Sequence, residues 1–297
     1  MASPLDPETL RSVIIEVFPD LAAATFTPQT RGWDSVAIDV DDRLMFKFPR
    51  HEAGRAGLVR EAALLAIIHA AVSLPTPNMT LHQGLPDGPP LFSRHEKLRG
   101  GYLEPALYAD LGEPARDRLA QDLAQFYAQL HALPAAAVQG AGAGPIKPWL
   151  EPDDILERAW PVLTEPLRAY AERTIGAWRA LPPDPHGVTY GFFDGHGWNM
   201  AFDPAAGRLN GVYDFGDSGF GQLQQEFIYS NMISPDLTAR IIDRYETLTG
   251  RSLDRERIGL LFAALRLSEL AEMAADAHWA PIALESVRAL SEAPPFT

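Results

Sequence analysis

The sequence predicts an α+β fold with two lobes, a small β-rich lobe followed by a larger and mainly helical lobe. Three short β-prone runs between residues 24 and 48 predict the first lobe, and helical spacing of apolar residues after Gly100-Gly101 predicts the second. With 297 residues, 46% of them hydrophobic, the chain is long enough to bury two cores. We expect the lobes to cover residues 1–99 and 100–297.

Local signals give the order of elements in the first lobe. Asp6 is suited to cap a helix and Pro7 to be its first residue, so the chain is expected to open with a helix that ends before Pro19. Alternating apolar residues then predict hairpins, a long helix and a further strand. These elements are expected over residues 24–48 (hairpins), 52–71 (helix) and 92–98 (strand).

Helical periodicity dominates the second lobe. Leu119, Leu123, Phe126 and Leu130 share one side of an amphipathic helix expected over residues 113–133. An Ala- and Gly-rich stretch then predicts a loop, and a Pro-to-Gly segment predicts a hairpin turn. The loop is expected over residues 135–145, the turn near 204–207, and the other helices over 153–181, 237–248 and 253–279.

Composition excludes several classes of protein. The absence of cysteine rules out disulfides, zinc thiolate sites and a cysteine nucleophile. The first residues lack the basic start and apolar core of a signal peptide, and the apolar stretches are too short to span a bilayer, so a cytoplasmic protein is expected. A formal net charge of −14 disfavours nucleic acid and anionic membranes and favours a cationic small molecule.

The most informative pattern joins an acid, an amide five residues later and a second acid after an apolar run. These residues are Asp194, Asn199 and Asp214. Phosphoryl transfer needs a carboxylate beside the attacking hydroxyl and oxygen ligands that hold Mg²⁺ on the nucleotide phosphates. We therefore expect Asp194 to orient the hydroxyl and accept its proton, and Asn199 and Asp214 to hold the metal.

Two charged residues stand on expected apolar surfaces. Lys47 lies within a strand that otherwise favours burial, and Glu61 lies on the apolar face of the next helix. Since a buried charge is costly unless it is paired, we expect the two to satisfy each other and leave the lysine able to hold phosphate oxygens. The alternative is a structural ion pair, or two side chains that extend to water.

Two weaker signals accompany this pattern. Gly32 and Ser35 lie between two expected strands, where backbone N–H groups would reach a phosphate, although the same residues suit a simple β-turn. His196 lies beside the candidate catalytic acid, and a structural role in holding its loop is the favoured interpretation.

The acceptor site is indicated by acidic residues in the C-terminal part. Glu269, Glu272 and Asp276 are spaced three and four apart, which puts them on one helix face with Trp279 one turn further on. Such a face would suit a polyamine-like substrate, although solvated acidic helix faces are common. Asp217, Glu226 and Tyr229 follow the second acid closely and are further candidates to line the pocket.

Several segments together resemble the aminoglycoside phosphotransferase family, which shares a protein-kinase-like fold with choline kinases. The matching segments lie at residues 32–35, 46–50, 60–65, 74–77, 95–100, 130–133, 194–199 and 211–219, and their order and spacing span about two-thirds of the chain. The resemblance implies ATP or GTP between the lobes, with Lys47 on the α- and β-phosphates and paired with Glu61. It also implies Asp194 as catalytic base, Asn199 and Asp214 as Mg²⁺ ligands, and purine contacts from backbone around Glu96–Leu98.

The chain departs from this family in two places. Phe192 and Phe193 stand where His-Gly usually precedes the catalytic acid, so polar contacts that hold the loop are lost. The pattern Gly-Asp-Pro-x-x-Asp is also altered, with Glu226 keeping a carboxylate near the second acid position. These changes affect expected activity and substrate choice, but they remove none of the assigned catalytic residues.

The resulting expectation is a Mg²⁺-dependent kinase that moves the γ-phosphate of ATP or GTP to a hydroxyl of a small molecule. An aminoglycoside is the leading acceptor class, and an amino alcohol, a sugar or another antibiotic remains open. Two alternatives are a nucleotide-binding protein with weak or no kinase activity, suggested by Phe192 and Phe193, and a metal-dependent hydrolase built on Asp194, His196, Asp214 and Asp217. The hydrolase gives no role to Lys47 and Glu61.

Overall fold

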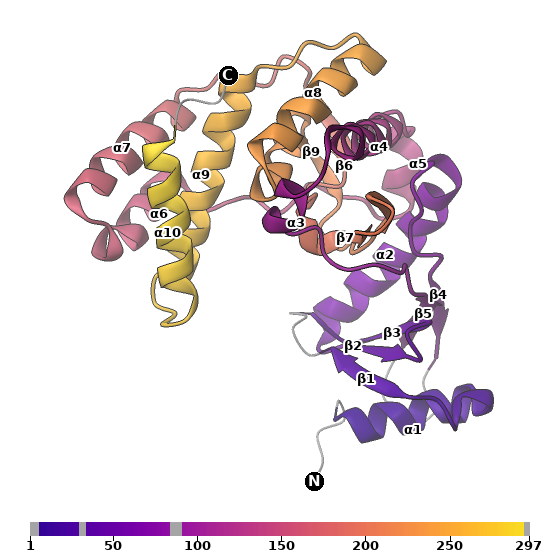
Figure 1. Cartoon of the computed structure of the whole chain (residues 1–297). Coiled ribbons are helices and arrows are strands. Elements are labelled where there is room, and N and C mark those ends of the chain that lie inside the picture. The colour runs from indigo at the N-terminus through magenta and orange to yellow at the C-terminus, as the bar shows by residue number, and fades with distance from the viewer. Residues whose placement is uncertain (1–5, 30–33, 84–90, 294–297) are drawn as a thin grey trace.

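The computed structural model describes residues 6–29, 34–83 and 91–293, which form a small β-rich lobe and a larger helical part (Figure 1). This is the α+β architecture that the sequence predicts. The division at residue 99 stays a prediction, as does the expected phosphate loop around Gly32, because residues 30–33 lie outside the described part. Among the described residues, no helix has the length and apolar character needed to cross a membrane.

The first lobe is built on a five-stranded antiparallel sheet with strand order β1-β2-β3-β5-β4. Its strands are β1 (Phe26–Gln29), β2 (Ser35–Val40), β3 (Leu44–Pro49), β4 (Thr80–His82) and β5 (Phe92–Glu96). Helix α1 (Pro7–Val17) begins where Asp6 accepts hydrogen bonds from the N–H groups of Glu8 and Thr9, as predicted. Leu10 and Ile14 of this helix pack with Phe46 and Phe48 of the sheet in one apolar core.

Alternation along β3 separates the core from the site. Phe46 and Phe48 are fully buried, whereas Lys47, which pairs with Ala37 of β2 and Ser93 of β5, is half-buried. Because successive side chains point to opposite faces of a strand, Lys47 faces away from the core with α1. Helix α2 (Glu52–Ala71) crosses on that side, and its Leu64, Leu65 and Ile68 belong to the core of the larger part.

The middle of the chain forms that second core. Helix α4 carries Leu119, Leu123, Phe126 and Leu130 into it, as its spacing predicted. The helices in this part of the chain are α3 (Pro105–Ala109), α4 (Glu113–His131), α5 (Ala135–Gly140) and α8 (Pro235–Thr249). Two 3₁₀ segments, η3 (Gly197–Asn199) and η4 (Leu223–Met232), accompany them. Two short antiparallel pairs carry the motif loops: β6 (Val188–Gly191) with β9 (Gly219–Gln222), and β7 (Met200–Asp203) with β8 (Arg208–Val212).

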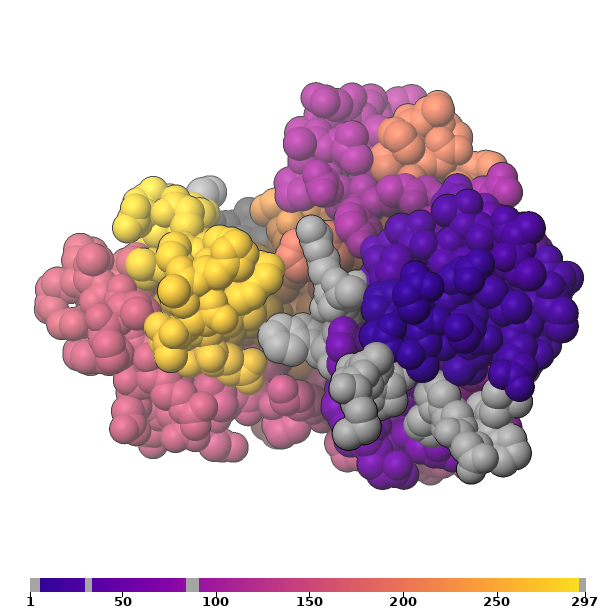
Figure 2. All heavy atoms as spheres, turned by 90° about the horizontal axis from the view of Figure 1, so that it is seen from below, coloured from indigo at the N-terminus to yellow at the C-terminus, as the bar shows by residue number. Residues whose placement is uncertain are grey.

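A third apolar core joins the remaining helices at the far side of the molecule. They are α6 (Pro152–Ala159), α7 (Glu165–Arg179), α9 (Arg255–Met273) and α10 (Trp279–Glu292). Figure 2 shows the first lobe (indigo) on one side of the molecule and α10 (yellow) on the other. The site described below lies where the first lobe meets the helical part, each of which has its own apolar core.

The elements differ from prediction at three positions. The Ala- and Gly-rich stretch expected to be a loop begins with α5, which its run of alanines favours. Strand β4 was not predicted. The helix expected over residues 253–279 ends at Met273, and Trp279 begins a separate helix, α10.

Candidate active site

Lys47 lies at the meeting point of the two lobes. Its Nζ is 3.1 and 3.3 Å from the two carboxylate oxygens of Glu61 and 3.2 Å from Oδ1 of Asp214. Burial opposes its charge, but the two carboxylates outweigh burial and raise the pKa of Lys47 above its ordinary value. The ion pair expected from the sequence is thus present, and a third partner, which the sequence did not reveal, joins it from 167 residues away.

Asp214 is held two residues beyond β8 in a left-handed conformation, with φ of 67°. The next residue fixes this loop, because the Phe215 N–H donates to Glu61 (3.2 Å) and its ring is fully buried. Arg60 of α2 adds a hydrogen bond to the Gly216 carbonyl (2.6 Å). Lys47 lowers the pKa of Asp214, and 56% of the aspartate side chain remains exposed, so an ionised carboxylate is available to a ligand.

Asp194 lies in the loop between β6 and η3, beside Asn199. The Asn199 amide nitrogen donates to Asp194 Oδ2 (2.5 Å) and to its main-chain carbonyl (3.0 Å). His196 Nε2 is 3.1 Å from Asp194 Oδ1, so both carboxylate oxygens have a partner. Burial opposes protonation of His196, yet Asp194 raises its pKa above the ordinary value. The loop role expected for His196 agrees with this contact.

The loops that carry Asn199 and Asp214 lie side by side. The Tyr213 N–H donates to the Asn199 carbonyl (3.0 Å), and the Tyr213 hydroxyl donates to the Trp198 carbonyl (2.8 Å). Since the Asn199 amide nitrogen is turned to Asp194, its amide oxygen points elsewhere and has no partner among the described residues. A free amide oxygen next to an exposed carboxylate is the donor chemistry that Mg²⁺ prefers, so these residues fit the metal.

Glu226 corrects one expectation from the sequence. It does not line the pocket beside Asp194, because its side chain is fully buried under the loop that contains Phe192 and Phe193. Its two oxygens accept hydrogen bonds from the N–H groups of Phe192 and Phe193, both 2.8 Å. His131 Nε2 lies 3.4 Å from the same carboxylate. A Cβ at Gly191 would come within 2.0 Å of Glu226 Oε2, so this approach requires a glycine.

Phe192 and Phe193 take different environments in that loop. Phe192 is fully buried against Phe215 (ring centroids 4.8 Å apart) and Phe126 (5.8 Å). Phe193 has φ of 53° and lines the pocket beside Asp194. The polar contacts expected to be lost with His-Gly are thus replaced by main-chain hydrogen bonds to Glu226. The carboxylate at position 226 could be noted from the sequence, but the direction in which its side chain points could not.

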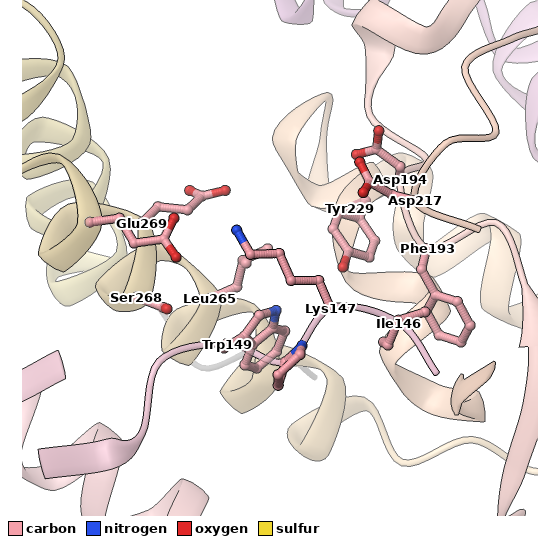
Figure 3. Close-up of a pocket in the computed structure, with 12 residues that line it drawn as sticks. Ile146, Lys147, Trp149, Phe193, Asp194, Asp217, Tyr229, Leu265, Ser268 and Glu269 are labelled. Carbon is pink, nitrogen blue, oxygen red and sulfur yellow. The ribbon is translucent and has the colours of Figure 1, made fainter. Parts of the chain in front are cut away.

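A pocket of about 270 Å³ opens beside Asp194 (Figure 3). Four of the residues expected at the substrate site line it: Asp217, Tyr229, Glu269 and Glu272. Burial raises the pKa of Glu269 and of Asp217, and Asp194 raises that of Asp217 further. Sequence reasoning missed the other lining residues, among them Ile146, Lys147, Pro148 and Trp149. The only signal in the sequence for these missed residues was the presence of Lys147 and Trp149 in a loop.

Asp276 is the second correction. It does not line the pocket, because α9 has ended three residues earlier. Its carboxylate accepts from the N–H groups of His278 (2.8 Å) and Trp279 (3.0 Å) at the start of α10. The expected acidic stripe therefore reduces to Glu269 and Glu272, and Asp276 instead holds the turn that precedes α10.

The other three residues expected at the nucleotide lie in two places: Ser35 at the start of β2, and Glu96 and Leu98 where the chain leaves β5. Ser35 begins β2 and pairs with Pro49. Glu96 ends β5 with an exposed side chain, and its carbonyl lies 2.9 Å from His95 Nδ1. Leu98 approaches β8, where a Cβ at Gly211 would come within 2.7 Å of its Cδ1. These positions are compatible with nucleotide contacts, which stay a prediction.

Comparison with known proteins places this site in a family. The Phosphotransferase enzyme family matches residues 25–261, so the chain belongs to it. The resemblance to aminoglycoside phosphotransferases noted in the sequence is thereby confirmed. No curated protein matches the chain.

Solved structures share its fold. A point mutant of aminoglycoside 2'-phosphotransferase-IIIa in complex with GDP is 23% identical, with a TM-score of 0.81 over 96% of this chain and 97% of that one. The streptomycin–ATP complex of APH(2")-IIa is 18% identical, with a TM-score of 0.63 over 99% and 98%. Macrolide 2'-phosphotransferase type I is 16% identical, with a TM-score of 0.65 over 96% and 98%. At these identities the likeness shows the kinase-like fold alone.

Proposed function

We propose that this phosphotransferase moves the γ-phosphate of ATP or GTP to a hydroxyl of a small, amino-bearing molecule. The observation that carries the proposal is the convergence of Lys47, Glu61 and Asp214 with the Asp194–Asn199 loop. The nucleotide would lie between the two lobes, residues 1–99 and residues 100–297, and the acceptor would lie in the pocket beside Asp194. The solved relatives with GDP, or with ATP and streptomycin, support this class of ligands.

The catalytic residues would act by position and charge. Asp194 would accept a hydrogen bond from the acceptor hydroxyl and take its proton, with the carboxylate oriented by Asn199 and His196. Lys47, fixed by Glu61, would hold phosphate oxygens of the nucleotide. Asn199 and Asp214 would hold Mg²⁺, which neutralises phosphate charge when bound. Ser35 and the main chain at Glu96 and Leu98 would contact the nucleotide.

Two alternatives make different predictions. A nucleotide-binding protein without kinase activity would bind nucleotide and give no phosphorylated product. This alternative was suggested by Phe192 and Phe193, and it is weakened because Glu226 holds the main chain of both residues. A metal-dependent hydrolase would turn over without nucleotide and use His196 as a ligand. That ring donates to Asp194 instead, and Lys47 again has no role in this reaction.

The test of the proposal is the Asp194→Asn variant. We expect it to lose transfer to any acceptor that the wild type phosphorylates, since the amide cannot take the proton, while Mg-nucleotide affinity measured by calorimetry stays within about twofold. Phosphorylated product would be quantified by mass spectrometry over aminoglycosides, macrolides, amino alcohols and sugars. Equal product from the variant, or none from the wild type with any acceptor, would contradict the proposal.

A further inference from the structure

One lysine projects into the otherwise acidic acceptor pocket. Lys147 lines the pocket together with Asp194, Glu269 and Glu272. Figure 3 shows its side chain crossing the pocket, with the amine directed toward Glu269. Within the described part of the chain, no acid lies close enough to Lys147 to form an ion pair with it. Its charge is therefore presented to whatever occupies the pocket.

The backbone on both sides of Lys147 is anchored. The Ile146 N–H donates to the Phe220 carbonyl of β9 (3.1 Å). On the other side, the Trp149 ring packs on Trp178 (centroids 5.5 Å apart) and the Leu150 N–H donates to the Ser268 hydroxyl of α9 (3.3 Å). Because both flanks are fixed, the ammonium group stays within side-chain reach of the pocket.

The charges around the pocket leave little for a polycation. Glu269 forms an ion pair with Arg266, so its charge is already compensated. Asp194 accepts from His196 and Asn199 and is the proposed base. Asp217 and Glu272 form no ion pair with a basic residue of the described part, although Lys147 lies close enough to lower the pKa of Asp217. One ammonium group of a ligand would balance the negative charge of these two carboxylates that Lys147 leaves uncompensated.

The walls of the pocket add an apolar component. Trp149, Phe193 and Tyr229 line it with aromatic rings. Such rings pack on an apolar surface and stabilise a single cation over their faces.

We propose that Lys147 selects the acceptor by occupying the place of one ammonium group, so that the pocket takes small hydroxyl compounds with a single amino group and an apolar face and disfavours polycations. This proposal rests on the proposed function, because it concerns the same acceptor pocket. It makes Lys147 a specificity residue rather than a catalytic one.

The test compares two probes by calorimetry in the absence of nucleotide: 2-amino-1-phenylethanol, with one amino group, and kanamycin, with several. The wild type is expected to prefer the first. Lys147→Met keeps the aliphatic bulk and removes the charge, so relative affinity should shift toward kanamycin by at least about tenfold, and less at high salt. Arg288→Met on α10, an exposed position outside the pocket, removes one charge elsewhere and should leave the ratio unchanged.

The outcomes separate the two proposals. An unchanged ratio in Lys147→Met, a shift equal to that of Arg288→Met, or a wild type that prefers kanamycin or binds neither probe would overturn the role of Lys147. A shifted ratio without phosphate transfer to any acceptor would support that role and contradict the proposed kinase function alone. Thermal unfolding of each variant would confirm that it is folded.

Discussion

At the scale of single residues, the site depends on charges that compensate one another between the lobes. Lys47 is neutralised by Glu61 and Asp214, and Glu61 also accepts the Phe215 N–H. A buried charge that loses its partner is strongly unfavourable, so these residues set one another's ionisation. A phosphate that enters would replace part of the Asp214 contact to Lys47 rather than meet a bare cation.

Replacing Lys47 by alanine tests its phosphate role. We expect Lys47→Ala to weaken nucleotide binding by at least about tenfold, because a charge-assisted contact to phosphate is lost. Calorimetric titration with ATP and GTP would measure this. Arg173→Ala, an exposed change on α7, is the matched control. Unchanged affinity in Lys47→Ala would leave the ion pair with Glu61 as a structural feature only.

His95 gives a prediction about pH. Burial of this β5 residue lowers its pKa from 6.5 to about 4. The unfolded chain therefore binds a proton in this range that the folded chain does not, so stability falls as pH is lowered from about 6.5 to about 4. Between pH 7 and pH 5, wild type should lose about 2 kcal/mol more than His95→Gln in urea unfolding. Equal losses would show that His95 is not buried in its neutral form.

At the scale of elements, short 3₁₀ and loop segments position the proposed catalytic groups, and longer helices support them. Segment η4 places Glu226 under the catalytic loop, and α2 places Glu61 and Arg60 against the metal loop. Lys47 and Glu61 could be predicted because each stood out on an apolar surface. The direction of Glu226 could not, since a spacing along the chain does not tell which side of an irregular segment is buried.

The Glu226→Gln variant tests the clamp on the catalytic loop. One oxygen becomes an NH₂ group that faces a main-chain N–H, so we expect a loss of about 1–3 kcal/mol in stability and a lower kcat with nucleotide affinity unchanged. Chemical denaturation and steady-state kinetics would measure both. Glu256→Gln on the exposed first turn of α9 is the control. A variant with normal stability and kcat would show that the loop holds its shape without this carboxylate.

The turn before α10 allows a separate test of Asp276. Asp276→Ala removes an acceptor from the N–H groups of His278 and Trp279, so amide exchange in α10 should become several-fold faster. Amine binding in the pocket should not change. Glu272→Gln should give the opposite pattern, weaker amine binding with normal exchange in α10, because Glu272 lines the pocket. Loss of amine binding in Asp276→Ala would restore the substrate role first expected for it.

At the scale of the whole molecule, separate cores carry the two halves of the site, which meet where Lys47 contacts Asp214. The two-lobed architecture was predictable because strand and helix periodicities separate along the sequence. The break that separates α9 from α10 and the helix α5 were not predictable, since no proline interrupts the first, and the stretch of α5 mixes alanine, which favours a helix, with glycine, which does not. The approach of Lys147 to the pocket was not predictable either, because it depends on the bridge between Pro145 and Phe220, which are far apart in the sequence.

The most direct test of this arrangement is a crystal structure with Mg²⁺ and a non-hydrolysable ATP or GTP analogue. We predict Mg²⁺ about 2.1 Å from the Asn199 amide oxygen and from the Asp214 carboxylate, with Lys47 on the phosphates and Asp194 facing the acceptor pocket. A metal bound to other residues, or a nucleotide away from Lys47, would contradict the proposed site.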